Sequence, residues 1–536
     1  MKDVLKKSRE LFFFTVFVGI IMTVFEVAAA YGIGQMIDTI SGSAFGSLNK
    51  VGVFCIAVVA LYMLFGVLYT HFSKKLNFSY LTTMKEMIFS KIFSSPISEY
   101  QEHNKAYYLN LLTQDIDRVN QNYLTLRYDN VVYFGEIIIS LTVMFSISWK
   151  MSLIFIIITT VTAIIPQLFA PVQSAKTEKY SVTLEKYVEF MDIFLSGYES
   201  MRSLAIEKAV FNRINEKNSN MENARRKYES VNESITYIIR SISLIAQLGC
   251  MFTGVYFVIT GNITTGQLIM AVQLLNSVFG PINSLSENMG LIKSSKVIQE
   301  KLEPFLIDEP EVQNSYEQYT PGDISVKDFS IELSGKKIFD HFNCIFEPGK
   351  SYAIVGSSGS GKSTLAKILG GYYTDYEGTV TYGSVERKKV SDKDLLKHVR
   401  YISPNPFIIN ESVKNNIKLY RDISDEDVLV AAKKVGFDES FLEKETLGDG
   451  AKYISSGELQ RIAIARILLD NPYVIIFDEP AANLDPINAA QINKLIASID
   501  VPIKIVITHD WDDDYLSAFD EIIDLNFGEV SAKADN

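Results

Sequence analysis

The feature that most constrains this chain is a series of long apolar segments confined to its N-terminal half. A helix needs ~20 residues to cross a hydrocarbon core, and in lipid its backbone groups must be paired within the segment. Six segments are about long enough: Leu11–Ile37, Val51–Phe72, Val131–Trp149, Met151–Pro171, Ile235–Thr260 and Gln267–Ile282. The sequence therefore predicts a helical membrane domain with six spans.

The links between these segments alternate in length and charge. Those around 39–50, at Lys150 and at 261–262 are short, whereas those at 73–130 and 172–234 are long and polar. Lysines and arginines flank the long links and the N-terminus, which favours placing that side in the cytoplasm. Periodic apolar residues predict that helices continue into the long links. We expect a multi-pass protein of the cell membrane with both termini in the cytoplasm.

The second half of the chain has a different composition. Prolines and acidic residues between 303 and 323 break helices and are typical of a linker. Beyond it, short β-rich runs alternate with helical stretches, which predicts an α/β domain with a largely parallel sheet. The expected division is therefore 1–302, a membrane domain, 303–323, a linker, and 324–536, a soluble domain. The net charge of -12 argues against nucleic acid as a partner.

A complete phosphate-binding P-loop stands near the start of the soluble domain, between a strand-like run at 352–355 and a helix-like run at 365–369. Its glycines let backbone N–H groups surround phosphate oxygens, its lysine supplies positive charge, and the following serine can bind Mg²⁺. The candidate nucleotide-binding residues are Gly356, Ser357, Ser358, Gly359, Ser360, Gly361, Lys362, Ser363 and Thr364.

A second motif ends in two acids. The buried-strand pattern at 474–477 is followed by Asp478 and Glu479, which places both carboxylates at the sheet edge beside the P-loop. We expect Asp478, with Ser363, to hold Mg²⁺, and Glu479 to polarise the attacking water. ATP and Mg²⁺ are therefore the expected ligands.

Further motifs resemble those of ATP-binding cassette proteins. Ile454-Ser455-Ser456-Gly457-Glu458 looks like the signature motif of this family and lies just upstream of the Asp478 strand. Ala482-Asn483-Leu484-Asp485 resembles the family's D-loop, and His509 resembles its switch histidine. With the six spans, the resemblance covers nearly the whole chain and implies an exporter-type half-transporter.

The resemblance implies a mechanism as well as a fold. Two cassettes would dimerise head to tail, so that ATP lies between the P-loop of one chain and the signature of the other. Signature residues Ser455 to Glu458, with Ser455 and Gly457 foremost, would then contact the partner's nucleotide. His509 would contact the γ-phosphate, and the segments near 106–115 and 197–204 would couple the cassette to the membrane helices.

The sequence departs from the family pattern at several positions. The usual Q-loop glutamine is replaced by Pro404, with Asn405 next to it, and the usual adenine-stacking aromatic by Leu333. Ser456, Glu458 and Asn483 also differ from the usual residues. These departures are compatible with a distinct half-transporter as partner, whereas a second identical chain is the other possibility.

Three functions fit these features. The first is ATP-driven export of an amphipathic peptide, drug or lipid, the second is import of a siderophore-like cargo, and the third is a non-pumping, ATP-gated membrane regulator. We favour export because this domain order is most often used for it. Charged residues inside the spans, Glu26, Glu136 and Arg240, are candidates for the cargo pathway.

Overall fold

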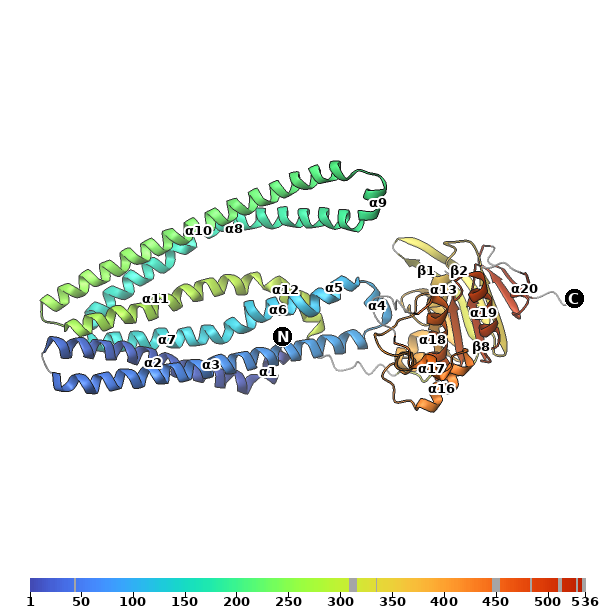
Figure 1. The fold of residues 1–536 in the computed structure, drawn as a ribbon, viewed down its shortest axis with the longest axis horizontal. Coiled ribbons are helices and arrows are strands. Elements are labelled where there is room, and N and C mark those ends of the chain that lie inside the picture. Colours follow the sequence, from blue (N-terminus) through green and yellow to red (C-terminus); the bar gives the residue numbers. More distant parts are fainter. Residues whose placement is uncertain are drawn as a thin grey trace. The chain divides into compact units, whose positions relative to one another are not determined.

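The computed structural model describes the chain except for residues 43–44, 308–315, 334, 446–453, 483, 510–512, 527–528 and 533–536. The chain divides into two compact units (Figure 1). Unit 1 comprises Met1–Lys91 and Ala106–Asp308, and unit 2 comprises Ile92–Lys105 and Glu309–Asn536. Much of the proposed linker and Asn483 of the D-loop therefore lie outside the described residues.

Unit 1 is helical throughout its described residues. Its elements are α1 (Lys2–Lys7), α2 (Arg9–Ser41), α3 (Phe45–Ser94), α5 (Lys105–Asn110), η1 (Leu111–Asp115), α6 (Ile116–Val119), η2 (Asn120–Thr125), α7 (Leu126–Ile147), α8 (Trp149–Ser196), α9 (Tyr198–Ser203), α10 (Glu207–Ile259), α11 (Thr265–Ser294), α12 (Lys296–Leu302) and η3 (Glu303–Phe305). The segments η1 and η2 are π-helical, so α5, α6 and α7 run on as one long helix.

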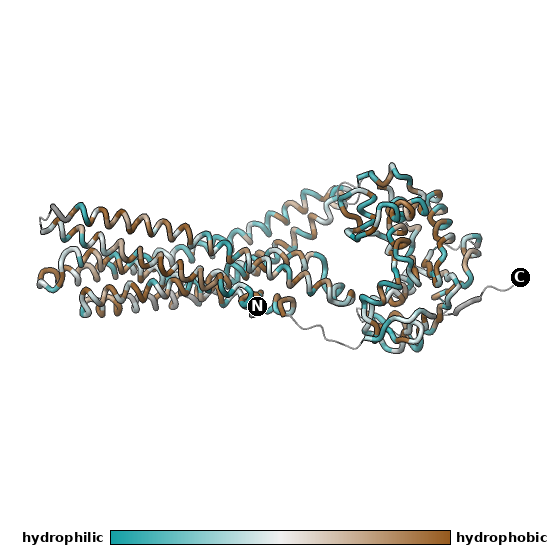
Figure 2. Tube along the Cα trace, turned by 90° about the horizontal axis from the view of Figure 1, so that it is seen from below, coloured by the Kyte–Doolittle hydropathy of each residue, from teal (hydrophilic) through white to brown (hydrophobic). Residues whose placement is uncertain are grey.

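Five helices in the described residues are long and apolar enough to cross a membrane. They are Arg9–Ser41, Leu48–Ser94, Lys105–Ile147, Glu207–Ile259 and Thr265–Ser294, and each overlaps one of the predicted spans. The remaining predicted span, 151–171, lies in α8, where several side chains are outside the described set. Hydrophobic residues dominate one half of the long helices and hydrophilic residues the other (Figure 2). The chain is thus a multi-pass membrane protein with helices that extend beyond the apolar zone.

The end of α2 is joined to the start of α11. Thr264 and Gln267 form a capping box, which satisfies two backbone donors at the N-terminus of α11. Asp38 near the end of α2 accepts hydrogen bonds from the Thr264 hydroxyl at 2.6 Å and from the Gly266 N–H at 2.8 Å. A carboxylate at this helix N-terminus also meets the positive end of the helix dipole. The first and last predicted spans are therefore fixed to each other at this end of the bundle.

A short helix follows α3. Short helix α4 (Ile97–Gln101) lies in the segment 92–105, which groups with the residues of unit 2. The coupling segment expected at 106–115 lies in α5 and η1 of unit 1. The second expected segment, 197–204, coincides with α9. Both expected segments are therefore helical, and their role in coupling stays a prediction.

Unit 2 contains two sheets. Strands β1 (Ile324–Leu333), β2 (Lys336–Phe346), β4 (Glu377–Tyr382) and β5 (Val385–Glu386) form an antiparallel sheet in the order β2-β1-β4-β5. Strands β3 (Lys350–Val355), β6 (Val399–Ile402), β7 (Val474–Asp478), β8 (Ile503–Ile507), β9 (Glu521–Asp524) and β10 (Glu529–Ala532) form the second, in the order β10-β9-β3-β8-β7-β6. All neighbours in this second sheet are parallel except β10 and β9.

The helices of unit 2 surround this parallel sheet, as the prediction of an α/β domain required. They are α13 (Lys362–Leu369), α14 (Asp392–His398), α15 (Val413–Lys418), α16 (Asp425–Lys434), α17 (Glu439–Leu442), α18 (Ser456–Leu468), α19 (Pro486–Ala497) and α20 (Asp513–Leu516), with the 3-10 turn η4 (Arg387–Lys389). Strand β7 is buried along its whole length. This burial explains its continuous apolar pattern, because both faces of a parallel sheet are covered.

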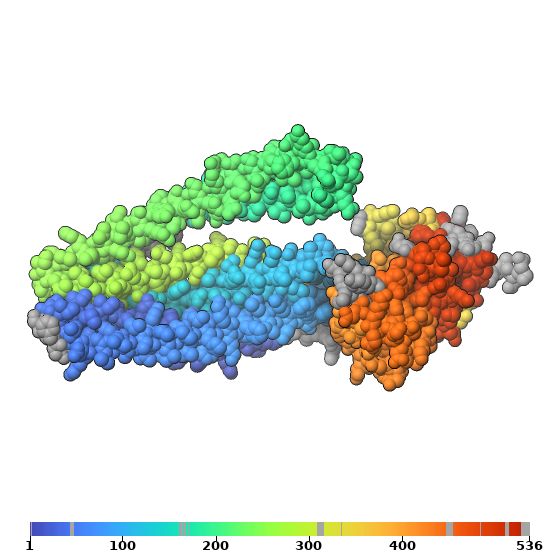
Figure 3. All heavy atoms as spheres, viewed as in Figure 1, coloured from blue at the N-terminus to red at the C-terminus, as the bar shows by residue number. Residues whose placement is uncertain are grey.

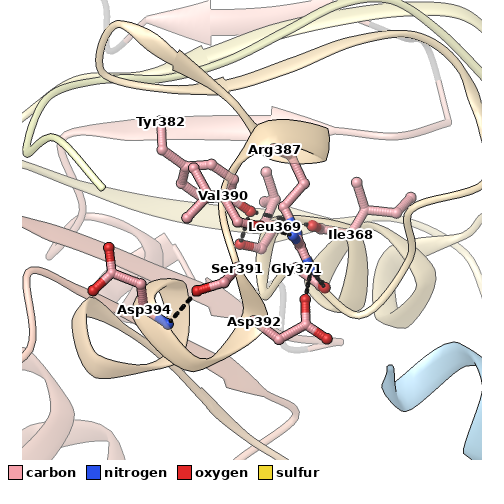
Figure 4. A network of polar contacts seen from close by, with 9 residues as sticks. All are labelled: Ile368, Leu369, Gly371, Tyr382, Arg387, Val390, Ser391, Asp392 and Asp394. Carbon is pink, nitrogen blue, oxygen red and sulfur yellow. Dashed lines mark hydrogen bonds and ion pairs between the residues drawn. The ribbon is translucent and has the colours of Figure 1, made fainter. Parts of the chain in front are cut away.

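A buried arginine connects the antiparallel sheet to the end of α13 (Figure 4). Arg387 is 2 % exposed and donates to the Gly371 carbonyl from Nε at 3.2 Å and from Nη2 at 2.6 Å. It also donates to the Val390 carbonyl and pairs with Asp392. The hydroxyl of Tyr382 donates to the Leu369 carbonyl at 2.8 Å. These contacts satisfy carbonyls at the C-terminus of α13, where a cation is also favoured.

Candidate active site

The candidate site is built at the carboxyl ends of β3, β7 and β8, which are neighbours in the parallel sheet. The P-loop follows β3, the acid pair ends β7, and His509 comes two residues after β8. Loops at this edge of an α/β sheet meet in space, which is why ligands bind there. The order β3-β8-β7 thus brings together three motifs that are far apart in the sequence.

The P-loop requires glycine at particular positions. Gly356, Gly359 and Gly361 have φ values of +153°, +84° and +98°, which are accessible to glycine at little cost. A Cβ on Gly356 would lie 2.7 Å from Ser360 Oγ, and one on Gly361 would lie 2.9 Å from a ring carbon of Phe339. Both the backbone conformation and the close neighbouring atoms therefore exclude a side chain at Gly356 and Gly361.

Lys362 lies at the first position of α13 and is 4 % exposed. Its Nζ donates to the carbonyls of Gly356 and Ser357, both at 2.9 Å. Burial lowers the pKa of Lys362, and the carboxylates of Glu479 and Asp478 oppose this effect. The ammonium is thus held inside the loop at the N-terminus of a helix. Both its positive charge and the helix N-terminus favour binding of an anionic phosphate there.

Ser360 supplies an independent observation on what this loop accommodates. Its hydroxyl oxygen is buried and has no hydrogen-bond partner among the described residues. Unpaired buried polar atoms are costly in native proteins, and an absent ion or ligand is one explanation for them. A hydroxyl directed into a loop of backbone amides fits a phosphate group. The residues present are therefore suited to a nucleotide.

Asp478 is held from two sides. Ser363 Oγ donates to its Oδ1 at 3.0 Å, and the Tyr401 hydroxyl donates to its Oδ2 at 2.7 Å. Burial raises the pKa of Asp478, whereas these two hydrogen bonds lower it. A serine hydroxyl and a carboxylate are hard oxygen ligands of the kind that Mg²⁺ prefers. The pair thus fits the expected Mg²⁺ site.

Glu479 and His509 lie beside each other at the edge of the sheet. His509 Nε2 lies 2.7 Å from Glu479 Oε1, and both side chains are only partly exposed. Glu479 has φ +48°, and its N–H donates to the Ile507 carbonyl at 3.0 Å. A left-handed glutamate is uncommon, and such conformations cluster at functional sites. The sharp turn after β7 aims the carboxylate along the sheet edge toward His509.

The signature residues have a local structural role. Ser455 is the N-cap of α18, and its hydroxyl accepts from the Glu458 N–H at 3.3 Å. In return, a Glu458 carboxylate oxygen accepts from the Ser455 N–H at 2.6 Å, which completes a capping box. Ser456 and Gly457 form the first turn of this helix. Glu458 also forms an ion pair with Lys444 at 3.6 Å, so the contacts of Ser455 and Glu458 are local to the start of α18.

Asp485 of the D-loop is also a helix cap. It accepts from the N–H groups of Ile487 and Asn488 at the start of α19, both at 3.1 Å. The side chain of Asn488 donates to its second oxygen at 2.6 Å. These hydrogen bonds, that from the Asn488 side chain first, lower the pKa of Asp485. The carboxylate is therefore held as an anion at a helix N-terminus.

Pro404 and Leu333, which replace the family's usual glutamine and aromatic residue, have different contacts. Pro404 accepts a hydrogen bond at its carbonyl from Gln460 Nε2, at 2.8 Å, so the Q-loop position is tied to the signature helix α18 through its backbone. Asn405 is exposed. Leu333 ends β1 and packs against the hydrophobic core of the unit. The structure thus gives Pro404 a structural contact where the family pattern would place a metal-sensing side chain.

Two residues of the site were missed at the sequence level. Tyr401 contacts Asp478 from the neighbouring strand β6, and Asn526 Oδ1 accepts from the P-loop N–H of Ser357 at 2.9 Å. The position of Tyr401, three residues before Pro404 in a strand pattern, could have indicated an inward side chain. Nothing in the sequence around Asn526 indicates its contact.

Comparisons with known proteins agree with this geometry. The model of the ABC transporter transmembrane region matches residues 12–282, and the ABC transporter model matches residues 339–482. An ATP-dependent lipid A-core flippase from Haemophilus influenzae is 24% identical over 96% of this chain and 91% of its own length. A probable ABC transporter ATP-binding/permease protein from the same species is 24% identical over 85% of this chain and 84% of its own length.

A multidrug resistance-like ATP-binding protein from Buchnera aphidicola is 25% identical over 84% of this chain and 80% of its own length. The two family models together cover both the apolar helices and the P-loop region, in the order that an exporter-type half-transporter has. The fused arrangement couples an ATPase to a membrane region. The chain therefore belongs to the ATP-binding cassette transporters, as a half-transporter of the exporter type.

Proposed function

We propose that this chain hydrolyses ATP to export an amphipathic molecule by alternating access, as half of a dimer. The observation that carries the proposal is the convergence of Lys362, Ser363, Asp478, Glu479 and His509 at one sheet edge. The domain limits proposed from the sequence, 1–302 and 324–536, assign the membrane and ATPase roles to the two parts of the chain. Both termini and the ATPase domain are placed in the cytoplasm.

Each residue of the site has a proposed part in ATP hydrolysis. The P-loop, Gly356 to Thr364, binds the phosphates through its N–H groups, its hydroxyls and Lys362. Ser363 and Asp478 hold Mg²⁺, which supplies charge stabilisation at the phosphates. Glu479 accepts a proton from the attacking water, and His509, fixed beside it at 2.7 Å, donates a hydrogen bond to the γ-phosphate.

The signature would complete the site of a second half-transporter. The N-terminus of α18 carries a partial positive charge, which supports binding of a partner's phosphate by Ser455 and Gly457. ATP held between two cassettes would favour the closed dimer, and hydrolysis would release it. The partner is a second copy or a distinct half-transporter, and the cargo is a lipid, peptide or drug. A lipid is favoured because several relatives are named as lipid A-core flippases.

The substitution Glu479→Gln tests the ATPase assignment. We expect it to lower the ATPase rate by about 10²- to 10⁴-fold, because the general base is lost while the shape of the site is kept. ATP should remain bound and the dimer should stay closed, as measured by retained radiolabelled nucleotide after gel filtration. The exposed Glu426→Gln on α16 is the matched control. Normal turnover by Glu479→Gln would contradict the assignment of Glu479 as the general base.

The direction of transport needs a separate measurement. Inverted vesicles with the ATPase domain outward should accumulate a labelled amphipathic lipid in the inner leaflet or lumen when ATP is added. ATP-dependent depletion would instead indicate an importer of the kind that takes up siderophore-like cargo. Ion flux without accumulation would indicate an ATP-gated regulator. Either of these results contradicts export.

A further inference from the structure

A side chain at the end of β9 continues the hydrogen bonding between β9 and β3. These two strands are parallel, with Val355 opposite Asp524 at their carboxyl ends. The Leu525 N–H donates to the Val355 carbonyl at 3.0 Å. One step further along the chain, the Ser357 N–H donates to Asn526 Oδ1 at 2.9 Å. The side chain of Asn526 therefore supplies the acceptor at the point where the chain leaves β3 and enters the P-loop.

Asn526 is itself held by the strand that it follows. Its backbone N–H donates to Asp524 Oδ1 at 2.9 Å, which is the hydrogen bond of an Asx turn. The beginning of β9 is fixed to β3 as well, because the N–H and the hydroxyl of Ser351 both donate to Asp520 at 2.7 Å. The strand that carries Asn526 is thus joined to β3 at both ends, and the position of its acceptor oxygen is well defined.

The peptide unit between Gly356 and Ser357 is held from both sides. Lys362 Nζ donates to its carbonyl oxygen at 2.9 Å, and Asn526 Oδ1 accepts from its N–H. The unit is a planar trans peptide, whose N–H and C=O point in opposite directions, so these two contacts fix its orientation. Gly356 has φ +153°, and the conformational freedom of glycine allows such a unit to rotate. Without Asn526 the unit would lose one of its two restraints.

The orientation of this peptide unit determines how Lys362 is held. A buried ammonium needs hydrogen-bond acceptors, and the carbonyls of Gly356 and Ser357 provide two of them at 2.9 Å. Rotation of the unit would turn the Gly356 carbonyl away from the ammonium and direct an N–H toward it. The loop would then have to rearrange before it could bind phosphate. A ligand that binds one conformation loses affinity in proportion to the population of the others.

We propose that Asn526 is a positioning residue that keeps the P-loop in the conformation that binds the phosphates of ATP. It acts through the peptide unit between Gly356 and Ser357, and through that unit on Lys362. The inference rests on the proposed binding of ATP at the P-loop and adds to it a residue outside the P-loop, the acid pair and the signature. The expected result of its loss is weaker nucleotide binding with little change in the rate at saturation, because the proposed general base follows β7, two strands away from β3.

Nucleotide binding and steady-state hydrolysis by the whole transporter test this role. Asn526→Leu keeps a side chain of similar size and removes the acceptor. We expect its Kd for the non-hydrolysable analogue AMP-PNP with Mg²⁺, measured by calorimetry, and its KM for ATP to rise about two- to tenfold, as for the loss of one hydrogen bond. Its kcat should stay close to wild type. Asn526→Asp keeps an acceptor oxygen and should bind more tightly than Asn526→Leu. The matched control is Asn415→Leu at an exposed position of α15, which should bind as wild type.

Three outcomes would overturn the proposal: equal affinity of wild type and Asn526→Leu, no gain in affinity from Asn526→Leu to Asn526→Asp, or a lower kcat with an unchanged KM. Thermal unfolding without nucleotide shows whether each variant is folded, and Asn526→Ala replaces Asn526→Leu in the comparison if the latter is not. A wild-type protein that does not bind AMP-PNP would contradict the proposed function and this inference with it. Equal affinity of the variants would instead leave the proposed function standing.

Discussion

At the scale of single residues, Asp478 shows how this chain holds the carboxylate of its proposed Mg²⁺ site. The Tyr401 hydroxyl and Ser363 Oγ occupy its two oxygens. Burial raises the pKa of Tyr401, and the neighbouring carboxylate of Asp478 raises it further, so the phenol remains a hydrogen-bond donor. The Q-loop position offers no side-chain ligand, because it is Pro404. Tyr401 therefore positions the carboxylate in a site that lacks the usual glutamine.

Tyr401→Phe should raise the Mg²⁺ concentration that ATPase activity requires. Loss of a hydrogen bond of about 1 kcal/mol corresponds to a roughly fivefold higher Mg²⁺ concentration at half-maximal ATPase activity. This hydrogen bond lowers the pKa of Asp478, so its loss raises that pKa and moves the acid limb of the Mg²⁺ dependence to higher pH. Tyr373→Phe is the control. An unchanged Mg²⁺ dependence would show that Tyr401 has only a packing role.

Glu458 offers a second prediction at this scale. Its replacement of the family's usual glutamine keeps the capping box, because either side chain can accept from the N-cap N–H. Glu458→Gln should therefore leave stability and ATPase activity close to wild type. Glu458→Ala should destabilise the cassette by about 1 kcal/mol, measured by thermal unfolding. Equal stability of the two variants would contradict a capping role.

The residues that could be predicted from the sequence are those whose chemistry requires a fixed local spacing. Lys362 and Ser363 follow glycines in a pattern that only a P-loop explains, and Asp478 and Glu479 end a buried strand. Tyr401 could not be assigned because its contact depends on the pairing of β6 with β7, between residues 77 positions apart. The local pattern could indicate that Tyr401 points inward, but it does not identify the residue that Tyr401 contacts.

At the scale of elements, the antiparallel sheet anchors the P-loop helix. Arg387 and Tyr382 bind carbonyls at the C-terminal end of α13, whose N-terminus carries Lys362. The helix is thus fixed at one end while its other end carries the P-loop. The sequence predicted the parallel sheet but not this second sheet, because β1 has several register shifts and lacks a regular alternation.

Arg387→Met should therefore destabilise the ATPase unit strongly. The change leaves buried carbonyls unpaired and should cost about 3 kcal/mol, which corresponds to a Tm lower by about 6–12 °C for a domain of this size. Thermal inactivation of ATPase activity measures the effect. The adjacent Lys389→Met removes a cation from an exposed ion pair and should change the Tm little. Similar losses in both variants would argue against the anchoring role.

At the scale of the whole molecule, the hairpin of α8 and α10 stands out from the other helices of unit 1. Figure 3 shows an open space between its distal half and the rest of that unit. Many large apolar side chains of the spans are exposed, among them Phe252 and Ile259 on α10. Exposed apolar surface of this extent requires lipid or a partner chain to cover it. The sequence predicted the spans from their length, but helix length alone does not define how they pack.

Mixing two inactive variants tests the composite ATP sites. Lys362→Ala removes the P-loop cation and Gly457→Asp places a negative charge at the signature. A mixed dimer would contain one site with both an intact P-loop and an intact signature. Random pairing of two copies should then restore about a quarter of wild-type ATPase activity. An inactive mixture whose native mass equals two chains of 60.3 kDa would contradict sites shared between copies.

The contact of Asp38 with Thr264 and Gly266 has a consequence for biosynthesis. The carboxylate and the Gly266 N–H are 228 positions apart, so ribosomes at ~5–20 residues per second produce them on the order of 10–50 s apart. During this interval the first span is in the membrane while Asp38 still lacks its partners on α11. Synthesis of α11 provides the partners of Asp38. A chain truncated before α11 would keep this carboxylate unpaired, and we expect proteases to degrade it faster than the full chain.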